Sequence, residues 1–195
     1  MSGHQKNEIF INLIKNADMK KLLIIIGLIS STVSFANSRD SIPVDPNDVS
    51  STSSIIKAVY DVISGPAGEK RNWDRMRTLF ASDARMIPTG KKPGGEVVRR
   101  ALTVEEYISS SGPFLEKNGF FETEIGRKTE QYGNIVQVFS TYESRKTKGD
   151  EKPFMRGINS FQLWNDGKRW WVINILWEPE TKENPIPEKF IGVIN

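Results

Sequence analysis

Few residues in this 195-residue sequence have side chains suited to nucleophilic, acid–base or metal chemistry. There is no cysteine, and the single histidine, His4, lies near the amino terminus. Thiolate nucleophiles and disulfides are therefore excluded, and so is histidine catalysis in any mature protein that begins after His4. No cluster of carboxylates has metal-ligand spacing, so we expect no metal ion and no cofactor.

Carboxylates remain as candidates for a general base, because burial in a pocket can raise their pKa toward neutrality. Glu143 and Glu178 lie near the ends of predicted strands. Asp and Glu are rarely buried completely, so exposure is the ordinary expectation for both residues. We therefore assign no catalytic residue.

The charge of the chain argues against a nucleic-acid partner. The formal net charge is +3, but residues 1–36 contain four lysines and only two acidic residues. The rest of the chain is nearly neutral, whereas a nucleic-acid-binding domain carries a concentrated basic surplus.

The first 36 residues contain a pattern typical of a secretory signal. Lys20 and Lys21 follow Met19, residues 22–29 are apolar, and Ser34 and Ala36 supply small residues for cleavage. The apolar run is shorter than the roughly 20 residues of a transmembrane helix. We expect a periplasmic or secreted protein with a signal peptide at about 19–36; the alternative is an uncleaved membrane anchor. Whether residues 1–18 are translated is left open.

The mature chain is expected to begin with a flexible linker, residues 37–51, followed by three helices. Ser51 offers an N-cap for a helix that ends before Gly65-Pro66, and a short helix is expected at 73–80. Thr103 and Glu106 have capping-box spacing for the third helix. A short strand is expected at 83–87.

Residues after 120 predict four strands, at 120–130, 135–144, 154–164 and 169–178. Asp166-Gly167 predicts a two-residue hairpin turn in which Asn165 faces Lys168. In that register one sheet face carries Arg156, Ser160, Gln162, Trp171, Ile173, Ile175 and Trp177. The opposite face carries Phe161, Leu163, Trp170, Val172 and Leu176, with Asn159 and Asn174 in its middle. Both faces are apolar, so we expect both to be covered.

Three segments resemble the nuclear transport factor 2-like, or SnoaL-like, superfamily, in particular its exported bacterial members of unknown function. They are Trp73-Asp74 with residues 79–84, residues 132–138, and residues 166–173 with Trp177-Glu178. The resemblance covers about residues 52–180 and leaves 181–195 as a C-terminal tail. It implies a cone-shaped α+β fold, with three N-terminal helices packed on a curved antiparallel sheet. The superfamily contains isomerases, dehydratases, cyclases, epoxide hydrolases and binding proteins, so the fold does not give the function.

A pocket between the helices and the sheet is the expected ligand site. Its predicted lining consists of Tyr60, Tyr107, Tyr142, Arg156, Ser160, Trp171 and Trp177. Arg156 would form a cation–π pair with Trp177 or anchor an acidic ligand. The alternative is that the aromatic residues only fill the core.

The leading interpretation is an exported domain that binds an unidentified small molecule. The alternatives are a cofactor-independent isomerase, hydrolase or cyclase-like enzyme, and a protein-interaction module. A buried carboxylate within hydrogen-bond reach of one of the predicted pocket tyrosines would favour the enzyme. The helices can cover only one sheet face, so we also expect a homodimer through the outer face. The expected contact residues are Phe161, Leu163, Trp170, Val172 and Leu176, and the tail could cover part of that face instead.

Overall fold

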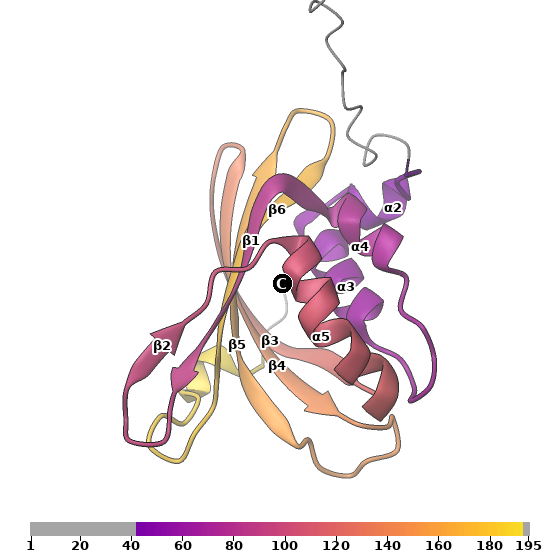
Figure 1. Ribbon diagram of the computed structural model, residues 1–195. Helices are drawn as coiled ribbons and strands as arrows, with labels where there is room; N and C mark the ends of the chain where they lie inside the picture. The colour runs from indigo at the N-terminus through magenta and orange to yellow at the C-terminus, as the bar shows by residue number, and fades with distance from the viewer. Residues whose placement is uncertain (1–41, 193–195) are drawn as a thin grey trace, which may run out of the picture. The chain divides into compact units, whose positions relative to one another are not determined.

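The structure is a computed structural model and describes residues 42–192. The predicted leader and the first part of the predicted linker lie outside these residues, so export stays a prediction. Six strands form one sheet in the order β2-β1-β6-β5-β4-β3. The helices lie on one side of this sheet and the C-terminal segment lies on the other (Figure 1). Within the described range, no helix has the length and hydropathy needed to cross a membrane.

Local sequence signals set the ends of the helices. The helices are α2 (Pro46–Val49), α3 (Thr52–Ile63), α4 (Trp73–Leu79) and α5 (Val104–Asn118). Ser51 and Thr103 cap α3 and α5 in capping boxes, which satisfy backbone N–H groups that have no partner within the helix. The predicted cap at Thr103 is confirmed. Gly119, with a φ of 70°, follows the last residue of α5.

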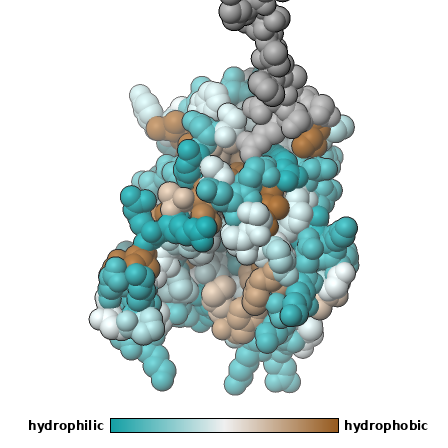
Figure 2. Space-filling model, viewed as in Figure 1, coloured by the Kyte–Doolittle hydropathy of each residue, from teal (hydrophilic) through white to brown (hydrophobic). Residues whose placement is uncertain are grey.

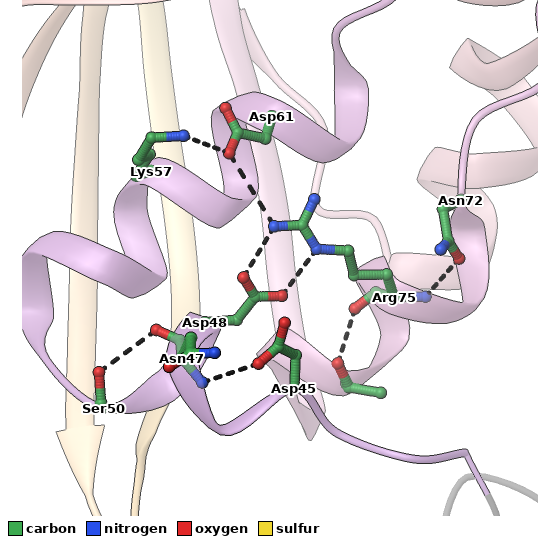
Figure 3. Close-up of polar contacts among 9 residues, drawn as sticks. Asp45, Asn47, Asp48, Ser50, Lys57, Asp61, Asn72 and Arg75 are labelled. Atoms are coloured by element: carbon green, nitrogen blue, oxygen red, sulfur yellow. Dashed lines mark hydrogen bonds and ion pairs between the residues drawn. The ribbon is translucent and has the colours of Figure 1, made fainter.

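Helix α2 lies inside the segment expected to be a linker, because a charged contact anchors it to the domain. Asp48 is 8% exposed. Its carboxylate accepts two hydrogen bonds of 2.7 Å from Arg75 of α4 (Figure 3). These hydrogen bonds hold the pKa of Asp48 below its usual value. The packed domain therefore begins near Pro46, ahead of the expected residue 52.

The four strands predicted after residue 120 are present and pair antiparallel in sequence order. They are β3 (Phe121–Tyr132), β4 (Ile135–Arg145), β5 (Met155–Asn165) and β6 (Trp170–Pro179). The predicted short strand is the twelve-residue β1 (Phe80–Lys91), which pairs antiparallel with β2 (Val97–Arg99). Because β1 runs parallel to β6, the sheet is mixed and not antiparallel throughout. The predicted α+β fold class is confirmed.

The predicted register of the β5–β6 hairpin is wrong. Asn165 pairs with Trp170, two residues beyond its expected partner, because residues 166–169 form a four-residue loop. The Asp166 carboxylate closes this loop by accepting hydrogen bonds of 2.8 Å from two backbone N–H groups and 2.9 Å from the Trp171 indole. The indole hydrogen bond is the main cause that lowers the pKa of Asp166, to about 2.

A β-bulge at Ile173 then exchanges the two faces of β6. Leu163 pairs with Val172, whereas Gln162 pairs with Asn174, so Ile173 is an extra residue without a partner. Beyond this bulge, each β6 side chain lies on the sheet face opposite to the one that an uninterrupted alternation predicts. Asn159 therefore pairs with Trp177 and not with Asn174.

Most of the face predicted for dimer contact is buried under the helices instead. Phe161, Leu163 and Val172 are 0%, 2% and 0% exposed, and Trp170 packs against this same core. A charge at Phe161 would therefore disrupt the core. Leu176 alone of the predicted set lies on the outer face.

The C-terminal segment covers part of the outer face. Its short 3-10 helix, η2 (Glu188–Phe190), places Phe190 edge to face against Phe139 of β4 at 5.6 Å. A homodimer through the outer face stays a prediction. The exposed large hydrophobic residues on the outer face of β3 to β6 are Tyr132, Ile135, Trp164 and Leu176.

Candidate functional site

A cavity of about 200 Å³ lies between helices α3 and α5 and the helix side of the sheet. Its lining is mostly apolar: Val59, Ile63, Met86, Tyr107, Ser111, Phe114, Leu115, Phe120, Glu122, Tyr142, Met155, Asn159, Phe161, Ile175 and Trp177. Phe114, on α5, is 57% exposed and therefore marks the mouth. Figure 2 shows hydrophobic groups gathered beside α5 on an otherwise largely hydrophilic surface. The cavity is thus an apolar recess that opens to solvent at α5.

Glu122 of β3 is the acidic residue of this lining. Its Oε2 accepts a hydrogen bond of 2.9 Å from the Ser144 hydroxyl, and its Oε1 accepts one of 3.3 Å from the Asn159 amide. Burial raises the pKa of Glu122 to about 7, although these two hydrogen bonds oppose the rise. Near neutral pH the side chain therefore exists both as carboxylate and as carboxylic acid, the condition under which a carboxyl group transfers protons most effectively.

A second β-bulge, at Ile125, turns Glu122 toward the cavity. The register of β3 against β4 shifts between Glu124 and Gly126, so that Ile125 is an extra residue. Without that residue, the alternation of β3 would place Glu122 and Glu124 on the outer face. Bulges re-aim side chains in this way and occur frequently beside active sites.

The C-terminal segment holds this bulge from the outer side. The Ile125 carbonyl accepts a hydrogen bond of 3.0 Å from the backbone N–H of Gly192. The Thr141 hydroxyl donates one of 2.5 Å to the Phe190 carbonyl. A Cβ atom on Gly126 would overlap this carbonyl, so a glycine is required where the segment crosses β3. The C-terminal segment therefore stabilises the bulged conformation of β3 that directs Glu122 into the cavity.

The hydroxyl group of Tyr142 is buried at the cavity wall and has no hydrogen-bond partner among the described residues. Tyr142 pairs with Gly157, where a Cβ atom would overlap this hydroxyl. Burial raises the pKa of Tyr142, so the phenol remains protonated and can donate. A buried polar group without a partner costs about 1–3 kcal/mol, which a ligand acceptor could recover.

Tyr60 lies behind the cavity wall and orients Asn159. The Ser140 hydroxyl donates to Glu124 at 2.6 Å and lies 2.7 Å from the Tyr60 hydroxyl. Because the Ser140 proton is used on Glu124, Tyr60 must donate to Ser140 and accept the hydrogen bond of 3.0 Å from the Asn159 amide. Tyr60 and Glu122 both accept from Asn159, so the amide nitrogen must point toward them.

Three of the predicted pocket residues, Tyr107, Tyr142 and Trp177, line this cavity. Tyr107 and Trp177 meet edge to face with their ring centroids 6.2 Å apart. Tyr60 contributes indirectly, through Asn159. The sequence therefore identified three of the six aromatic rings of the lining.

Arg156, Ser160 and Trp171 share one face of the β5–β6 hairpin, as predicted, but the helices cover the opposite face, so all three lie on the outer side of the sheet. The Arg156 guanidinium approaches Glu180 at 3.4 Å. Trp171 is covered by the Arg169 guanidinium, 3.3 Å from the ring centroid. The predicted pairing of Arg156 with Trp177 is wrong, and an acidic ligand anchored by Arg156 has no support in this cavity.

Glu122 and Asn159, two polar residues of the cavity lining, were not among the predicted pocket residues. The carboxylates considered from the sequence were Glu143, which forms an ion pair with Arg145, and Glu178, which is exposed. Glu122 follows two phenylalanines at the start of a strand, which is a signal that one face there is buried. The bulge that decides which face Glu122 joins leaves no such signal.

Comparisons with known proteins support the fold. No protein-family model matches the sequence, and no curated protein matches it. A Nostoc punctiforme protein of unknown function with a cystatin-like fold superposes with a TM-score of 0.50 at 11% identity, over 66% of this chain and 87% of that chain. An uncharacterized Caulobacter vibrioides protein with a cystatin-like fold gives 0.48 at 10% identity, over 67% and 88%. A Silicibacter pomeroyi protein of unknown function, described as NTF-2 like, gives 0.46 at 10% identity, over 67% and 94%.

At these identities the likeness establishes the fold alone. The described part of the chain has an α+β fold of the cystatin-like kind, and its sheet and helices enclose an apolar cavity. The fold class is thus settled, while the chemistry of the cavity must be argued from its own residues.

Proposed function

We propose that this domain binds a small, mostly apolar molecule that carries one hydrogen-bonding group. The observation that supports it best is the unpaired, buried hydroxyl of Tyr142 in the wall of a mostly apolar cavity that the Glu122 carboxyl group also lines. An apolar cavity of about 150 Å³ holds a benzene molecule. A cavity of about 200 Å³ therefore suits a molecule of one ring or a short chain.

Blocking the mouth of the cavity tests this proposal. Ser111 lies on α5, is partly exposed and lines the cavity, so Ser111→Trp should fill the entrance without disturbing the core. Ser109→Trp, on the exposed face of the same helix, is the matched control. Ligand-observed NMR with phenol and benzyl alcohol should show binding to the wild type and to the control, and loss of binding in Ser111→Trp. Equal binding by both variants would refute the proposal.

A second candidate function is cofactor-independent proton transfer by Glu122, although the hydrogen bonds of its carboxyl group go to Ser144 and Asn159 and not to a pocket tyrosine. Burial raises the pKa of this carboxyl group to about 7, where it can remove a proton from a substrate. The Tyr142 phenol is a neutral donor that can stabilise an oxyanion on that substrate. The absence of cysteine, and of histidine other than His4, leaves carboxyl and phenol groups as the natural acid–base pair.

Deuterium exchange distinguishes this enzyme from a binding protein. A small ketone such as cyclohexanone exchanges its α-hydrogens with D₂O when a base removes them, and NMR follows the loss of signal. The wild type should accelerate this exchange with a pH profile that inflects near 7, and Glu122→Gln should not accelerate it. If the wild type binds phenol but exchanges no faster than Glu122→Gln, the domain is a binding protein.

A further inference from the structure

The cavity contains an acidic group that no cation of the lining compensates. Among the described residues that line it there is no lysine, arginine or histidine. The partners of the Glu122 carboxyl group are the neutral Ser144 hydroxyl and Asn159 amide. The titratable groups that face it from the surrounding elements are the phenols of Tyr60 on α3, Tyr107 on α5 and Tyr142 on β4. These phenols are neutral because burial raises their pKa values, so the carboxylate has no countercharge.

The rest of the wall is unusually aromatic. Six rings line the cavity: Tyr107, Phe114, Phe120, Tyr142, Phe161 and Trp177. The faces of such rings are electron-rich and attract organic cations, and cages of this kind recognise ammonium groups. An aromatic wall that includes one carboxylate offers a cation both an ion pair and ring faces.

We propose that the cavity binds a small organic amine as its ammonium ion, with Glu122 as the counterion and the aromatic rings around the carbon skeleton. This inference rests on the proposed small-molecule binding and names the class of ligand. The ammonium group donates to Glu122, which has lone pairs left after its two hydrogen bonds. An adjacent acceptor on the ligand would take the free proton of Tyr142.

Other ligand charges fit less well. An anion would lie against the Glu122 carboxylate with no basic residue of the lining to offset the repulsion. A neutral ligand would displace solvent from the carboxylate and leave it without a countercharge, which is costly for a charged group. An ammonium ion removes both penalties.

This pairing gives amine binding a defined dependence on pH. The ammonium ion requires the ionised form of Glu122, whose pKa burial raises to about 7. As the pH falls below that value, protons compete with the amine, and its affinity should fall by up to about tenfold per pH unit. Above it the affinity should level off for as long as the amine itself remains protonated. A neutral ligand should show no such loss at low pH.

Three probes of the same size and different charge test the proposal: benzylamine, benzyl alcohol and benzoate. Isothermal titration calorimetry at pH 8 should give benzylamine an affinity about tenfold or more above that of benzyl alcohol, with no binding of benzoate. A tenfold difference corresponds to about 1.4 kcal/mol. Glu122→Gln should remove the advantage of benzylamine while keeping benzyl alcohol. Glu130→Gln, exposed on the same strand, should change neither.

Each outcome has one meaning. If benzyl alcohol binds as well as benzylamine and Glu122→Gln changes nothing, the amine proposal is overturned while small-molecule binding stands. If none of the probes binds, and phenol gives no signal that Ser111→Trp removes, the proposed function fails as well. Should Glu122→Gln not fold, the wild type alone decides, because a benzylamine affinity that is equal at pH 8 and pH 5.5 also overturns the proposal.

Discussion

Two glutamates of strand β3, Glu122 and Glu124, point to the same side of the sheet and meet opposite surroundings. Glu124 accepts hydrogen bonds of 2.8 and 2.5 Å from the Arg127 guanidinium, and the side chains of Glu124 and Arg127 are 11% and 4% exposed. Glu122 meets only neutral donors and an apolar cavity. A carboxylate buried with its cation fixes structure, whereas one buried without a cation is left with a charge that a ligand or a proton can neutralise.

The two glutamates are also linked. Glu124 accepts from Ser140, Ser140 accepts from Tyr60, and Tyr60 accepts from the Asn159 amide that donates to Glu122. The structural ion pair therefore orients the amide that holds the ligand-facing carboxyl group. Substitutions at the two ends of this series of hydrogen bonds, the Glu124–Arg127 ion pair and Glu122, should therefore differ in their effects on stability and on ligand binding.

The largest effect is expected from breaking the ion pair. Arg127→Met leaves Glu124 buried without its cation and should lower the free energy of unfolding by about 3–5 kcal/mol, measured by chemical denaturation. Arg99→Met, at an exposed position on β2, should change it by less than about 0.5 kcal/mol. Removing both charges with Glu124→Leu in the Arg127→Met background should restore much of the loss. If Arg127→Met were as stable as Arg99→Met, the structural role of the Glu124–Arg127 ion pair would be contradicted.

The bulge at Ile125, which directs Glu122 and Glu124 to the helix side of the sheet, can be disrupted by a substitution on the outer face. Gly126→Val introduces a side chain where the Phe190 carbonyl lies, and overpacking of this kind costs about 2 kcal/mol. We expect faster hydrogen exchange at the Gly192 amide and weaker binding of phenol, because the position of Glu122 depends on the bulge. Gly90→Val is the control, since no atom lies within 4 Å of a Cβ there and its φ is not positive. Unchanged exchange at Gly192 would show that the tail does not depend on Gly126.

Glu122 gives the free energy of unfolding a defined dependence on pH. The pKa of Glu122 rises from 4.5 in the unfolded chain to about 7 in the folded state, so the folded state binds more protons between these values. The stability of the wild type should therefore fall as the pH rises from about 4.5 to about 7, and then level off.

Glu122→Gln should lack this dependence. It should match the wild type near pH 4.5 and exceed it by about 1–2 kcal/mol at pH 8, a value discounted because the carboxyl group faces a solvent-accessible cavity. Parallel urea denaturation at the two pH values measures the difference. A wild type whose stability does not change between them would contradict the burial of Glu122 without a cation.

The smallest effects distinguish two tyrosine hydroxyls. Tyr60 hydrogen bonds with Ser140 and Asn159, so Tyr60→Phe should cost about 1–2 kcal/mol in thermal or chemical unfolding. The Tyr142 hydroxyl has no partner, so Tyr142→Phe should leave stability unchanged within about 0.5 kcal/mol or raise it slightly. The same substitution should weaken benzyl alcohol binding, which Tyr60→Phe affects only through Asn159. Equal losses of stability would contradict the distinction.

Much of the fold followed from local sequence signals. The capping box at Thr103, the break at Gly65-Pro66 and the alternating runs after residue 120 predicted helices and strands close to those observed, because each depends on neighbours in the chain. The aromatic residues Tyr107 and Tyr142 were placed in the pocket for the same reason: a helix face or an unbroken strand alternation positions them. Trp177 reaches the pocket only because the bulge at Ile173 reverses the alternation of β6.

What the tertiary structure alone decided is which face each polar residue joins. The bulges at Ile125 and Ile173 and the loop at residues 166–169 shift the register, and a shift of one residue moves every later side chain to the other face. Both faces of these strands carry large apolar groups, so hydrophobic alternation could not detect the shift. Glu122 entered the cavity for that reason, whereas Arg156 lies outside it because the helices cover the other face of β5. The sequence determined the layers, and packing across the sheet determined the site.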